Sequence, residues 1–553
     1  MAKQLLTTTI SAPGFLGINT QESSVDLSSG YALEAYNCVI DKFGRIGARK
    51  GYQHRHATNV DLSTNNIEFI FELPQETTVF AGGNNKMFTL ANSSSTTLVT
   101  AIDGTVADAA GSGTTAYTIS DNNWSASSIV YGEGPDVEPH AYFCQTGHLP
   151  LVYHRLGASH AHSGSYGFNL LSDCGSVPTS YSAAPTDFKP NVVLGAYGRT
   201  WWADIAGDKQ TVYFSALLDG SNLSTGDSGY LSLVDVFPNG DQVVGLAAHN
   251  GFLIIFGKRN IAIYANPIDV TQLTLADLIT NVGCIARDSI VNTGTDVMFL
   301  SDTGVRSIAR VIQEKSAPIN DISFNIRDDL VSFVDSETDK ERIKAAYYPR
   351  DAFYILSVPT SKYVFCFDLR ARLQNGAARA TVWDSINPTA LHVTYTGNLL
   401  LGKAGYIGKY GSHLDDTATY KMRYYTNHFD LGSPTSLKFL KKANFTVVGG
   451  IGQNVFVKYG FDYVASYKDI RKSLVAGNVS EYNAKDELGN ALYEYNDTVA
   501  PIAEYSSGLA LEEVRSNLGG SGSVIQLGFE ADINQNPLSI QKIDVYVKAG
   551  KTV

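Results

Sequence analysis

The sequence predicts an all-β protein: a β-propeller of about six to seven blades, an additional C-terminal β domain and a few short helical insertions. Two observations lead to this prediction. Glycine (50 residues) and tyrosine (31 residues) are abundant, and only 17% of the residues are charged, as expected for many short strands joined by tight turns. Apolar segments separated by polar turns also recur as a unit at intervals of roughly 50 residues, which is the spacing of propeller blades.

Seven copies of this unit can be recognised. In each copy the two middle segments are apolar at nearly every position, which is typical of strands buried on both faces. Strands of a β-sandwich usually face water on one side and alternate more regularly, so the pattern favours a propeller over a sandwich or a string of smaller β domains. The copies span residues 79–90, 141–153, 192–203, 243–264, 290–308, 345–367 and 391–410.

The end of the repeat divides the chain into three parts. We predict an N-terminal arm (residues 1–30), the propeller with its insertions (31–416) and a C-terminal β domain (417–553). In the last part the apolar segments are longer and better separated, and a polar, glutamate-bearing linker covers residues 476–515.

Three stretches inside the propeller region break the strand pattern. Residues 273–282 and 319–334 carry apolar side chains at helical spacing, and Pro318 and Asn320 are start signals for the second helix. Residues 102–130 are rich in glycine, serine, threonine and asparagine, which predicts a long polar loop or a small insertion.

Charge and cysteine usage limit the possible functions. The net charge is -12 and the isoelectric point is near 5.4, which disfavours tight nucleic-acid binding because phosphates need clustered lysine and arginine. The densest basic spots are Arg45, Arg49 and Lys50, and Lys438, Lys441 and Lys442. The five cysteines form no Cys-x-x-Cys pair, which predicts reduced thiols, and neither a signal peptide nor a membrane-spanning segment is predicted.

Glycine, asparagine, aspartate and arginine form a spaced pattern near the N-terminus, where a short apolar strand runs into the turn Asp41–Gly44. Residues 245–264, followed by 302–304, and the ending at 537–550 add to this pattern. Together they resemble the tail nozzle (tail tubular protein B-like) and packaged-DNA-stabilisation proteins of short-tailed bacteriophages. The N-terminal residues that carry the resemblance are Gly17, Asn19, Asn37, Asp41, Gly44, Arg49 and Gly51.

The resemblance implies a structural protein of the virion tail, assembled in the host cytoplasm, and not an enzyme. Six copies would form a ring below the portal, in contact with the head–tail adaptor and with tail fibre or tail-tip proteins. The ring would retain the packaged double-stranded DNA and conduct it during ejection without binding it tightly. An acidic wall is compatible with that role, since like charge repels the phosphates. The alternative is a propeller-fold tail protein that binds or degrades a glycan.

Three sequence motifs resemble catalytic signatures, and each has a structural interpretation. Residues 397–404 resemble a phosphate-binding loop, but Ala404 replaces the magnesium-binding hydroxyl and three leucines predict a buried strand. Residues 226–229 (Gly-Asp-Ser-Gly) resemble a protease nucleophile segment, but no histidine base can be assigned. Residues 301–304 resemble an Asp-box turn without its aromatic anchor, which predicts a hairpin turn capped by Asp302.

Two side-chain groups are weaker candidates for binding sites. His154, His160 and His162 are possible metal ligands, although the sequence offers no acidic or cysteine ligand at a convincing spacing. Trp201 and Trp202 beside Arg199 would suit a stacking platform for a sugar or base, and buried blade aromatics are the favoured interpretation. The sequence thus predicts no catalytic residue, no cofactor and no metal, and it leaves the residues that line a DNA channel unknown.

Overall fold

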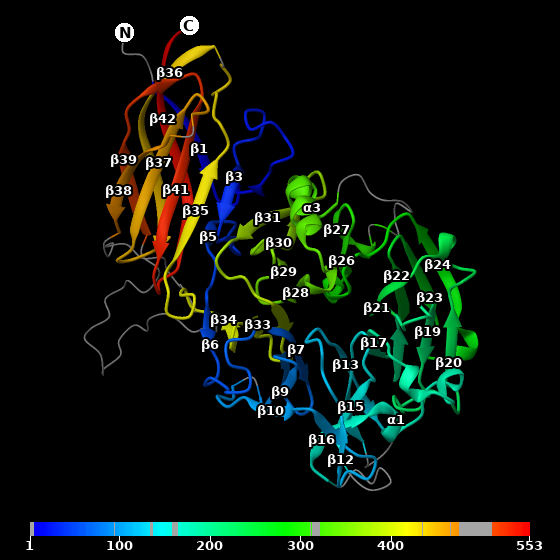
Figure 1. Ribbon diagram of the computed structural model, residues 1–553. Helices are drawn as coiled ribbons and strands as arrows, with labels where there is room; N and C mark the ends of the chain where they lie inside the picture. Colours follow the sequence, from blue (N-terminus) through cyan, green and yellow to red (C-terminus); the bar gives the residue numbers. More distant parts are fainter. Residues whose placement is uncertain are drawn as a thin grey trace, which may run out of the picture.

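The computed structural model describes residues 5–92, 94–132, 137–156, 164–309, 311, 321–433, 435–464, 466–474 and 511–552. A ring of β-sheets is joined on one side to an elongated β-sandwich that contains both chain ends (Figure 1). The predicted propeller with an additional C-terminal β domain is therefore confirmed.

The ring is built from short antiparallel sheets, numbered here as blades in chain order. Six blades are separate sheets, and the remaining one, the sixth, forms one end of a ten-stranded sheet. From the second blade to the seventh, the first strands of successive blades contact one another, and β32 of the seventh blade contacts β7 of the first. The first and second blades are joined by a contact between β7 and β14.

The blades contain the following strands. The first has β7 (Ile67–Leu73), β8 (Thr78–Gly83), β9 (Lys86–Leu90) and β10 (Val99–Ile102); the second has β13 (Ser125–Tyr131), β14 (Glu138–Cys144), β15 (Leu151–Arg155) and β16 (Tyr166–Leu170), extended by β11 (Thr105–Ala107) and β12 (Thr114–Ala116). The third has β17 (Val192–Ala196), β18 (Arg199–Ala203), β19 (Thr211–Phe214) and β20 (Gly229–Ser232); the fourth has β21 (Val243–His249), β22 (Phe252–Gly257), β23 (Asn260–Ala265) and β24 (Thr274–Thr280). The fifth has β25 (Val291–Asn292), β26 (Val297–Ser301) and β27 (Gly304–Ser307), and the sixth has β28 (Lys344–Tyr348), β29 (Phe353–Val358), β30 (Tyr363–Arg372) and β31 (Ala378–Trp383).

The seventh blade closes the ring with a strand from the other end of the propeller sequence. It consists of β32 (Ala390–Val393), β33 (Leu399–Lys403) and β34 (Tyr406–Tyr410), and its outer strand is β6 (Tyr52–His54). Gly51 precedes β6 at a close approach of two segments of the chain, because a Cβ atom there would lie 1.9 Å from the Leu414 carbonyl oxygen. The segment before the first blade is thus hydrogen-bonded to the last one.

Middle strands of the blades are buried on both faces, as their continuous apolar sequences predict. Every residue of β18 and of β29 is buried. Such strands pack against the neighbouring blade on each side, which explains why they do not alternate between apolar and polar residues.

The sandwich combines the C-terminal strands with the N-terminal ones. One sheet contains β39 (Leu511–Asn517), β36 (Ser436–Gly449), β42 (Leu538–Thr552), β5 (Ile46–Ala48) and β4 (Cys38–Ile40), together with β1 (Leu5–Ser11) and β40 (Ser521–Gly522). The other is the continuation of the sixth blade through β3 (Tyr31–Tyr36), β35 (Tyr420–Thr426), β41 (Ile525–Ile533), β37 (Asn454–Phe461) and β38 (Lys468–Ser473), with β2 (Gly17–Ile18) on β3. Residues predicted as an arm and as the start of the propeller thus contribute strands to the C-terminal sheets.

Four local predictions need correction. Residues 273–282 do not form a helix: residues 274–280 are the edge strand β24. Of the two alternatives for residues 102–130, the long polar loop is wrong, because the segment contains β11, β12 and most of β13; β11 and β12 extend the sheet of the second blade, as a small insertion would. The helix predicted at 319–334 begins later, as α3 (Arg327–Ser336), and residues 319–320 lie outside the described part. Residues 511–515 of the predicted linker belong to β39, and residues 476–510 lie outside the described part.

Two further observations concern the whole chain. All five cysteines are free thiols, in agreement with the prediction from their spacing. Among the residues that the structure describes, neither α1 (Leu171–Cys174), α3 nor any 3-10 turn has the length and apolar character needed to span a membrane.

Candidate functional site

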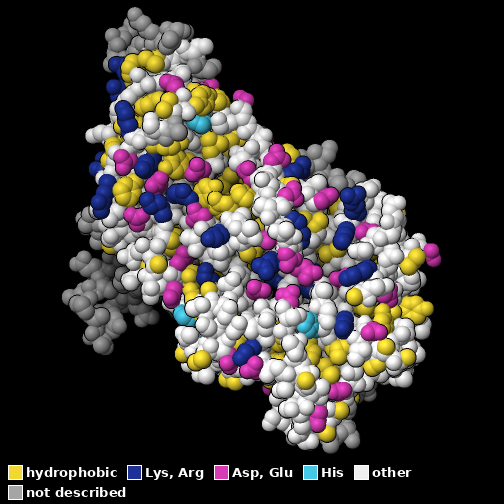
Figure 2. All heavy atoms as spheres, in the orientation of Figure 1, with side chains coloured by type: hydrophobic (Ala, Val, Ile, Leu, Met, Phe, Trp, Pro, Cys, Tyr) yellow, Lys and Arg dark blue, Asp and Glu magenta, His cyan; other side chains and the backbone are white. Residues whose placement is uncertain are grey.

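The centre of the propeller contains two adjoining cavities. One, of about 330 Å³, is lined by the first strands of most blades, including β7, β13, β17 and β32. The other, of about 360 Å³, lies beside it and shares Glu68 and Lys344 in its wall. Acidic and basic side chains gather around the middle of the propeller in Figure 2. This polar centre is where a propeller enzyme or binding protein would be expected to hold a ligand.

A buried arginine occupies this centre. Arg287, in the turn before β25, donates to the carboxylate of its neighbour Asp288 from Nε (2.8 Å) and from a terminal nitrogen (3.0 Å). The same guanidinium donates to the carbonyl and side-chain oxygens of Asn191, at 2.8 and 2.7 Å, and to the side-chain oxygen of Asn123 at 3.1 Å. The fifth blade is thereby bonded to the segments that precede the second and third blades.

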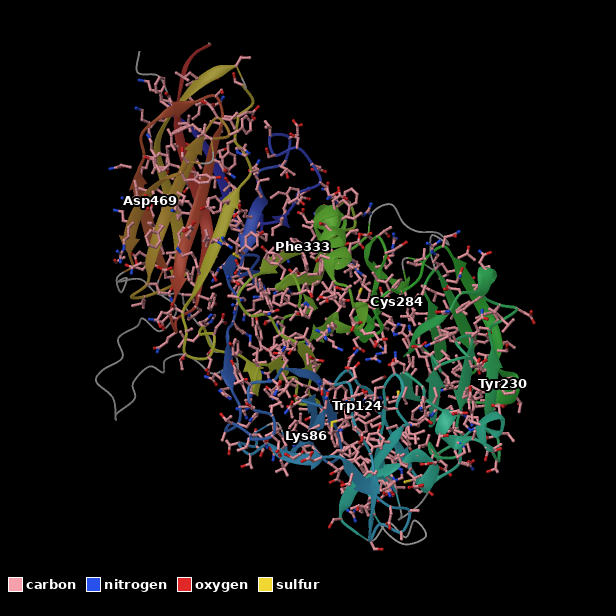
Figure 3. All side chains as sticks on the ribbon, in the orientation of Figure 1. Lys86, Trp124, Tyr230, Cys284, Phe333 and Asp469 are labelled. Atoms are coloured by element: carbon pink, nitrogen blue, oxygen red, sulfur yellow. The ribbon has the colours of Figure 1, made fainter. Side chains whose placement is uncertain are left out.

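A lysine completes the cluster from the sixth blade. Lys344, at the start of β28, donates to Asp288 and to the Asn123 side chain. Asn123 and Asn191 in turn donate to Glu341, which precedes β28, at 3.1 Å and 2.9 Å. Trp124, which lies in the first part of the ring (Figure 3), is 1% exposed beside this network. We call Arg287, Asp288, Lys344, Asn123 and Asn191 the channel cluster.

The electrostatics of the channel cluster favour a permanent ion triad. Burial opposes ionisation of Asp288, but Arg287 and Lys344 outweigh it and hold the pKa of Asp288 at about 2. Burial, assisted by the Arg287 charge, lowers the pKa of Lys344, and Asp288 partly offsets this effect. A carboxylate held ionised by two cations cannot act as a general acid near neutral pH, since that role needs a raised pKa.

Two of the N-terminal pattern residues, Asn37 and Arg49, lie together at a second place, the junction between propeller and sandwich. Arg49 is fully buried and binds Asp415 with two hydrogen bonds of 2.8 and 2.7 Å. Its Nε donates to Asn37 Oδ1 (3.0 Å), and one of the two nitrogens that bind Asp415 also donates to Ser385 Oγ (2.6 Å). The guanidinium lies 4.1 Å from the centre of the Tyr420 ring. We call these five residues the junction cluster.

Other residues of the pattern have structural roles nearby. The Asp41 carboxylate accepts from the Phe43 and Arg45 backbone N–H groups at 2.8 and 2.9 Å and so closes the predicted turn. Gly44 has φ +74°, and a Cβ atom there would lie 2.6 Å from Pro13. The pattern thus marks how the chain enters the sandwich and then the ring, and it brings no nucleophile or metal ligand together.

The motifs that resemble catalytic signatures have structural roles. In the motif that resembles a phosphate-binding loop, residues 399–403 form β33, and the three leucines of this strand are buried. In the Gly226–Gly229 turn, Ser228 Oγ donates to the Thr225 carbonyl at 2.8 Å. The turn at 301–304 joins β26 to β27 as predicted. Among its residues, all of which the structure describes, the side chain that bonds within the turn is Ser301 and not Asp302: Ser301 Oγ donates to the Gly304 carbonyl at 2.9 Å and lies 3.2 Å from Thr303 Oγ1.

The two groups of candidate binding residues, the tryptophan pair and the histidines, differ in what surrounds them in the structure. Trp201 and Trp202 are completely buried, which confirms the structural interpretation and excludes an exposed stacking platform at these residues. His154 lies within 4.8 Å, ligand atom to ligand atom, of Glu138 and His140. These two residues stand two apart on one strand and thus share a face, a signal that sequence reasoning missed. His160 and His162 lie outside the described residues.

Comparisons with known proteins add little about this site. No family model and no curated protein matches the chain. Among solved structures it is similar to the Pan2 WD40 domain of Neurospora crassa, with TM-score 0.37 and 9% identity over 66% of this chain and 96% of that one. It is also similar to PorZ, a surface component of the type-IX secretion system of Porphyromonas gingivalis, with TM-score 0.34 and 13% identity over 83% of this chain and 55% of that one. The chain spans about half of PorZ, and at these TM-scores neither likeness bears on function.

Proposed function

We propose that this protein is a structural subunit of the tail of a short-tailed bacteriophage, a nozzle or tail-hub protein that forms a ring around the DNA path. The N-terminal pattern carries the proposal: the residues that resemble the nozzle and DNA-stabilisation proteins include Asn37 and Arg49 of the junction cluster, which joins the two parts of the fold. A subunit of a conduit needs such a rigid connection.

In this proposal the DNA path lies between copies of the chain and not along the axis of each propeller. The channel cluster bonds the fifth blade to segments of the second, third and sixth blades, so a duplex cannot pass through the ring of one chain. Each copy carries a net charge of -12. Copies placed around a common axis would therefore present an acidic assembly to the phosphates, which favours sliding over tight binding.

Strand β1 is the surface we assign to contacts between copies. It pairs with β42 along seven residues, and the described strands place no partner on its other edge. Its sequence, Leu-Leu-Thr-Thr-Thr-Ile-Ser, has no charge, whereas the edge strands β38 and β39 carry lysine, arginine, aspartate or glutamate. Hydrophobic side chains are exposed over the sandwich in Figure 2. An uncharged edge strand is suited to pairing with another chain.

The assembly can be tested directly on the full chain. Size-exclusion chromatography with light scattering is expected to give a mass near six times 59.7 kDa, and negative-stain images of the particles should contain closed rings. A chain that remains monomeric at high concentration and cleaves a polysaccharide would contradict the proposal and favour the glycan-degrading alternative.

Charging the β1 edge is expected to dissociate the ring without unfolding the chain. Leu5 and Leu6 are 49% and 46% exposed, so Leu5→Lys with Leu6→Lys should change the thermal unfolding temperature little. The sedimenting species should shift from oligomer to monomer, as measured by analytical ultracentrifugation. The matched control is Val60→Lys, on a propeller residue that is 92% exposed, and it should leave the oligomer intact. An unchanged oligomer in the double variant would exclude β1 as the contact.

A further inference from the structure

The second blade contains a buried group of metal-ligating side chains that has no part in the proposed tail function. Glu138 and His140 lie on β14 and His154 on the adjacent strand β15. The three side chains are 3–8% exposed, and one ligand atom from each lies within 4.8 Å of the others. Strand register brings them together. Ala141 pairs with Tyr153 in the antiparallel sheet, so His140, one residue before Ala141, lies opposite His154, one residue after Tyr153.

We propose that Glu138, His140 and His154 bind one divalent transition-metal ion, with zinc as the expected occupant. Two imidazoles and one carboxylate are a ligand set that zinc and iron(II) use in proteins. The burial of these groups is already offset in part by the Glu138–His140 contact of 2.6 Å and by Arg155 Nε, which lies 3.9 Å from Glu138 Oε2. An ion bound between the three side chains would compensate their desolvation further.

The arrangement around His154 selects the nitrogen that binds. The Asn169 amide nitrogen donates to the backbone carbonyls of Ala107 and Asp108, at 3.3 and 2.7 Å, which fixes its Oδ1 toward His154 Nε2 at 3.1 Å. An amide oxygen only accepts, so His154 Nε2 must carry the hydrogen and Nδ1 carries the lone pair. A carbonyl oxygen on the second nitrogen is the usual support of a metal-bound histidine.

His140 is oriented in a similar way. Its ring stacks on Tyr131, with centroids 4.6 Å apart and planes 6° apart, and its Nδ1 lies 3.4 Å from the Tyr142 hydroxyl. Its Nε2 points at Glu138 Oε1, 2.6 Å away. An ion shared by these two atoms would replace this hydrogen bond: Nε2 would release its proton, and the two atoms would move apart to accommodate metal–ligand bonds of about 2 Å each.

Cys174 is close to the group but is assigned a supporting role. Its Sγ lies 3.1 Å from His154 Nε2, on the nitrogen that already donates to Asn169. A thiol on the hydrogen-bearing nitrogen lies on the side of the ring away from the lone pair. The ligand set is thus nitrogen and oxygen only, with the remaining positions of the ion open to water.

Metal content of the full chain tests the proposal. After dialysis against a chelator, titration with Zn²⁺ against a chromophoric competitor is expected to give one tight site per chain. His140→Ala and Glu138→Gln should abolish that site, and Asn169→Ala, a positioning variant, should weaken it by about 10- to 100-fold. The matched control is His148→Ala, a half-buried histidine in the turn between β14 and β15 of the same blade, whose Nε2 lies 3.1 Å from Ser120 Oγ, and it should bind as the wild type does.

Two further readouts keep the test decisive. Glu138→Gln carries the test if His140→Ala does not fold. After removal of metal by the chelator, wild type and Glu138→Gln should give the same circular dichroism spectrum, which establishes that the substitution does not change the fold. Co²⁺ in the site should give d–d absorption without a sulfur charge-transfer band, and Cys174→Ser should leave the spectrum unchanged. A wild-type chain that binds no more Zn²⁺ than Glu138→Gln would overturn the site, and a thiolate band lost in Cys174→Ser would overturn the ligand set. The inference does not depend on the tail proposal.

Discussion

Replacing Asp288 by asparagine is expected to lower the free energy of unfolding by about 3–5 kcal/mol, the cost typical of removing one partner from a buried ion pair. The substitution leaves Arg287 and Lys344, which are 7% and 6% exposed, as two neighbouring cations without their shared carboxylate. Urea unfolding followed by tryptophan fluorescence measures the effect, since Trp124 lies beside the cluster. The matched control is Asp469→Asn, on an exposed carboxylate of the sandwich (Figure 3), which should change stability by less than about 0.5 kcal/mol.

The same carboxylate predicts a pH dependence. The pKa of Asp288 is about 2 in the folded chain, against an ordinary value of 3.8 that we take for the unfolded chain. The contribution of this carboxylate to the free energy of unfolding is therefore fully present above about pH 4 and is lost as the pH falls from about 4 to 2. That contribution is about 2 kcal/mol. The stability of Asp288→Asn should therefore fall less steeply than that of the wild type over this window. Parallel curves for the two proteins would contradict the assignment of a permanent ion triad.

Replacing Asp415 by asparagine, at the junction of propeller and sandwich, is expected to lower the free energy of unfolding by as much as the Asp288 substitution does. Arg49 is 0% exposed and would lose a bidentate carboxylate, which again predicts a loss of about 3–5 kcal/mol. The loss should appear in both parts of the fold, because the junction cluster bonds the N-terminal segment to Ser385 and Tyr420 as well. Hydrogen exchange, read separately on peptides of the seventh blade and of the sandwich, measures it.

A neighbouring surface ion pair provides the comparison for this variant. Lys50, which follows Arg49, pairs with Asp351 at 3.2 Å, and the two side chains are 18% and 31% exposed. Asp351→Asn is expected to cost at most about 1 kcal/mol, since exposed pairs are screened by water and salt. If Asp415→Asn were as mild as Asp351→Asn, burial would not govern the strength of the junction.

The sequence was informative wherever burial on both faces dictates the residue type. The continuous apolar segments at 353–358 and 399–401 are buried blade strands, as predicted. Periodicity failed at 273–282, because β24 is an edge strand whose register shifts within the pairing with β23, so its apolar residues do not alternate strictly. The polar-loop prediction was also wrong at residues 105–116, because these short strands are rich in threonine and alanine. Strand β12 pairs with β11, and β11 joins the second blade through the pairing of Ala107 with Asn169 of β16.

The pairing of distant segments was beyond local reasoning. Nothing near residue 52 indicates that β6 completes a blade whose other strands begin at residue 390. The channel cluster has the same origin: Asn123, Asn191 and Arg287 are ordinary loop residues until ring closure brings their side chains together. Likewise, the sequence singled out His154 as a possible metal ligand but not Glu138 or His140. Their spacing of two residues places these two side chains on one face, but only strand register brings that face to His154.

The sheet shared by the sixth blade and the sandwich has a mechanical consequence. Tyr36 of β3 pairs with Val382 of β31 and with Arg423 of β35, so main-chain hydrogen bonds run from the ring into the sandwich without a flexible tether. A force applied to the far end of the sandwich would therefore be transmitted through this sheet, with the sandwich acting as a lever, and would tilt the sixth blade first. Because ring contacts join that blade to its neighbours, the motion would propagate around the propeller as a change of shape instead of a swing about a hinge.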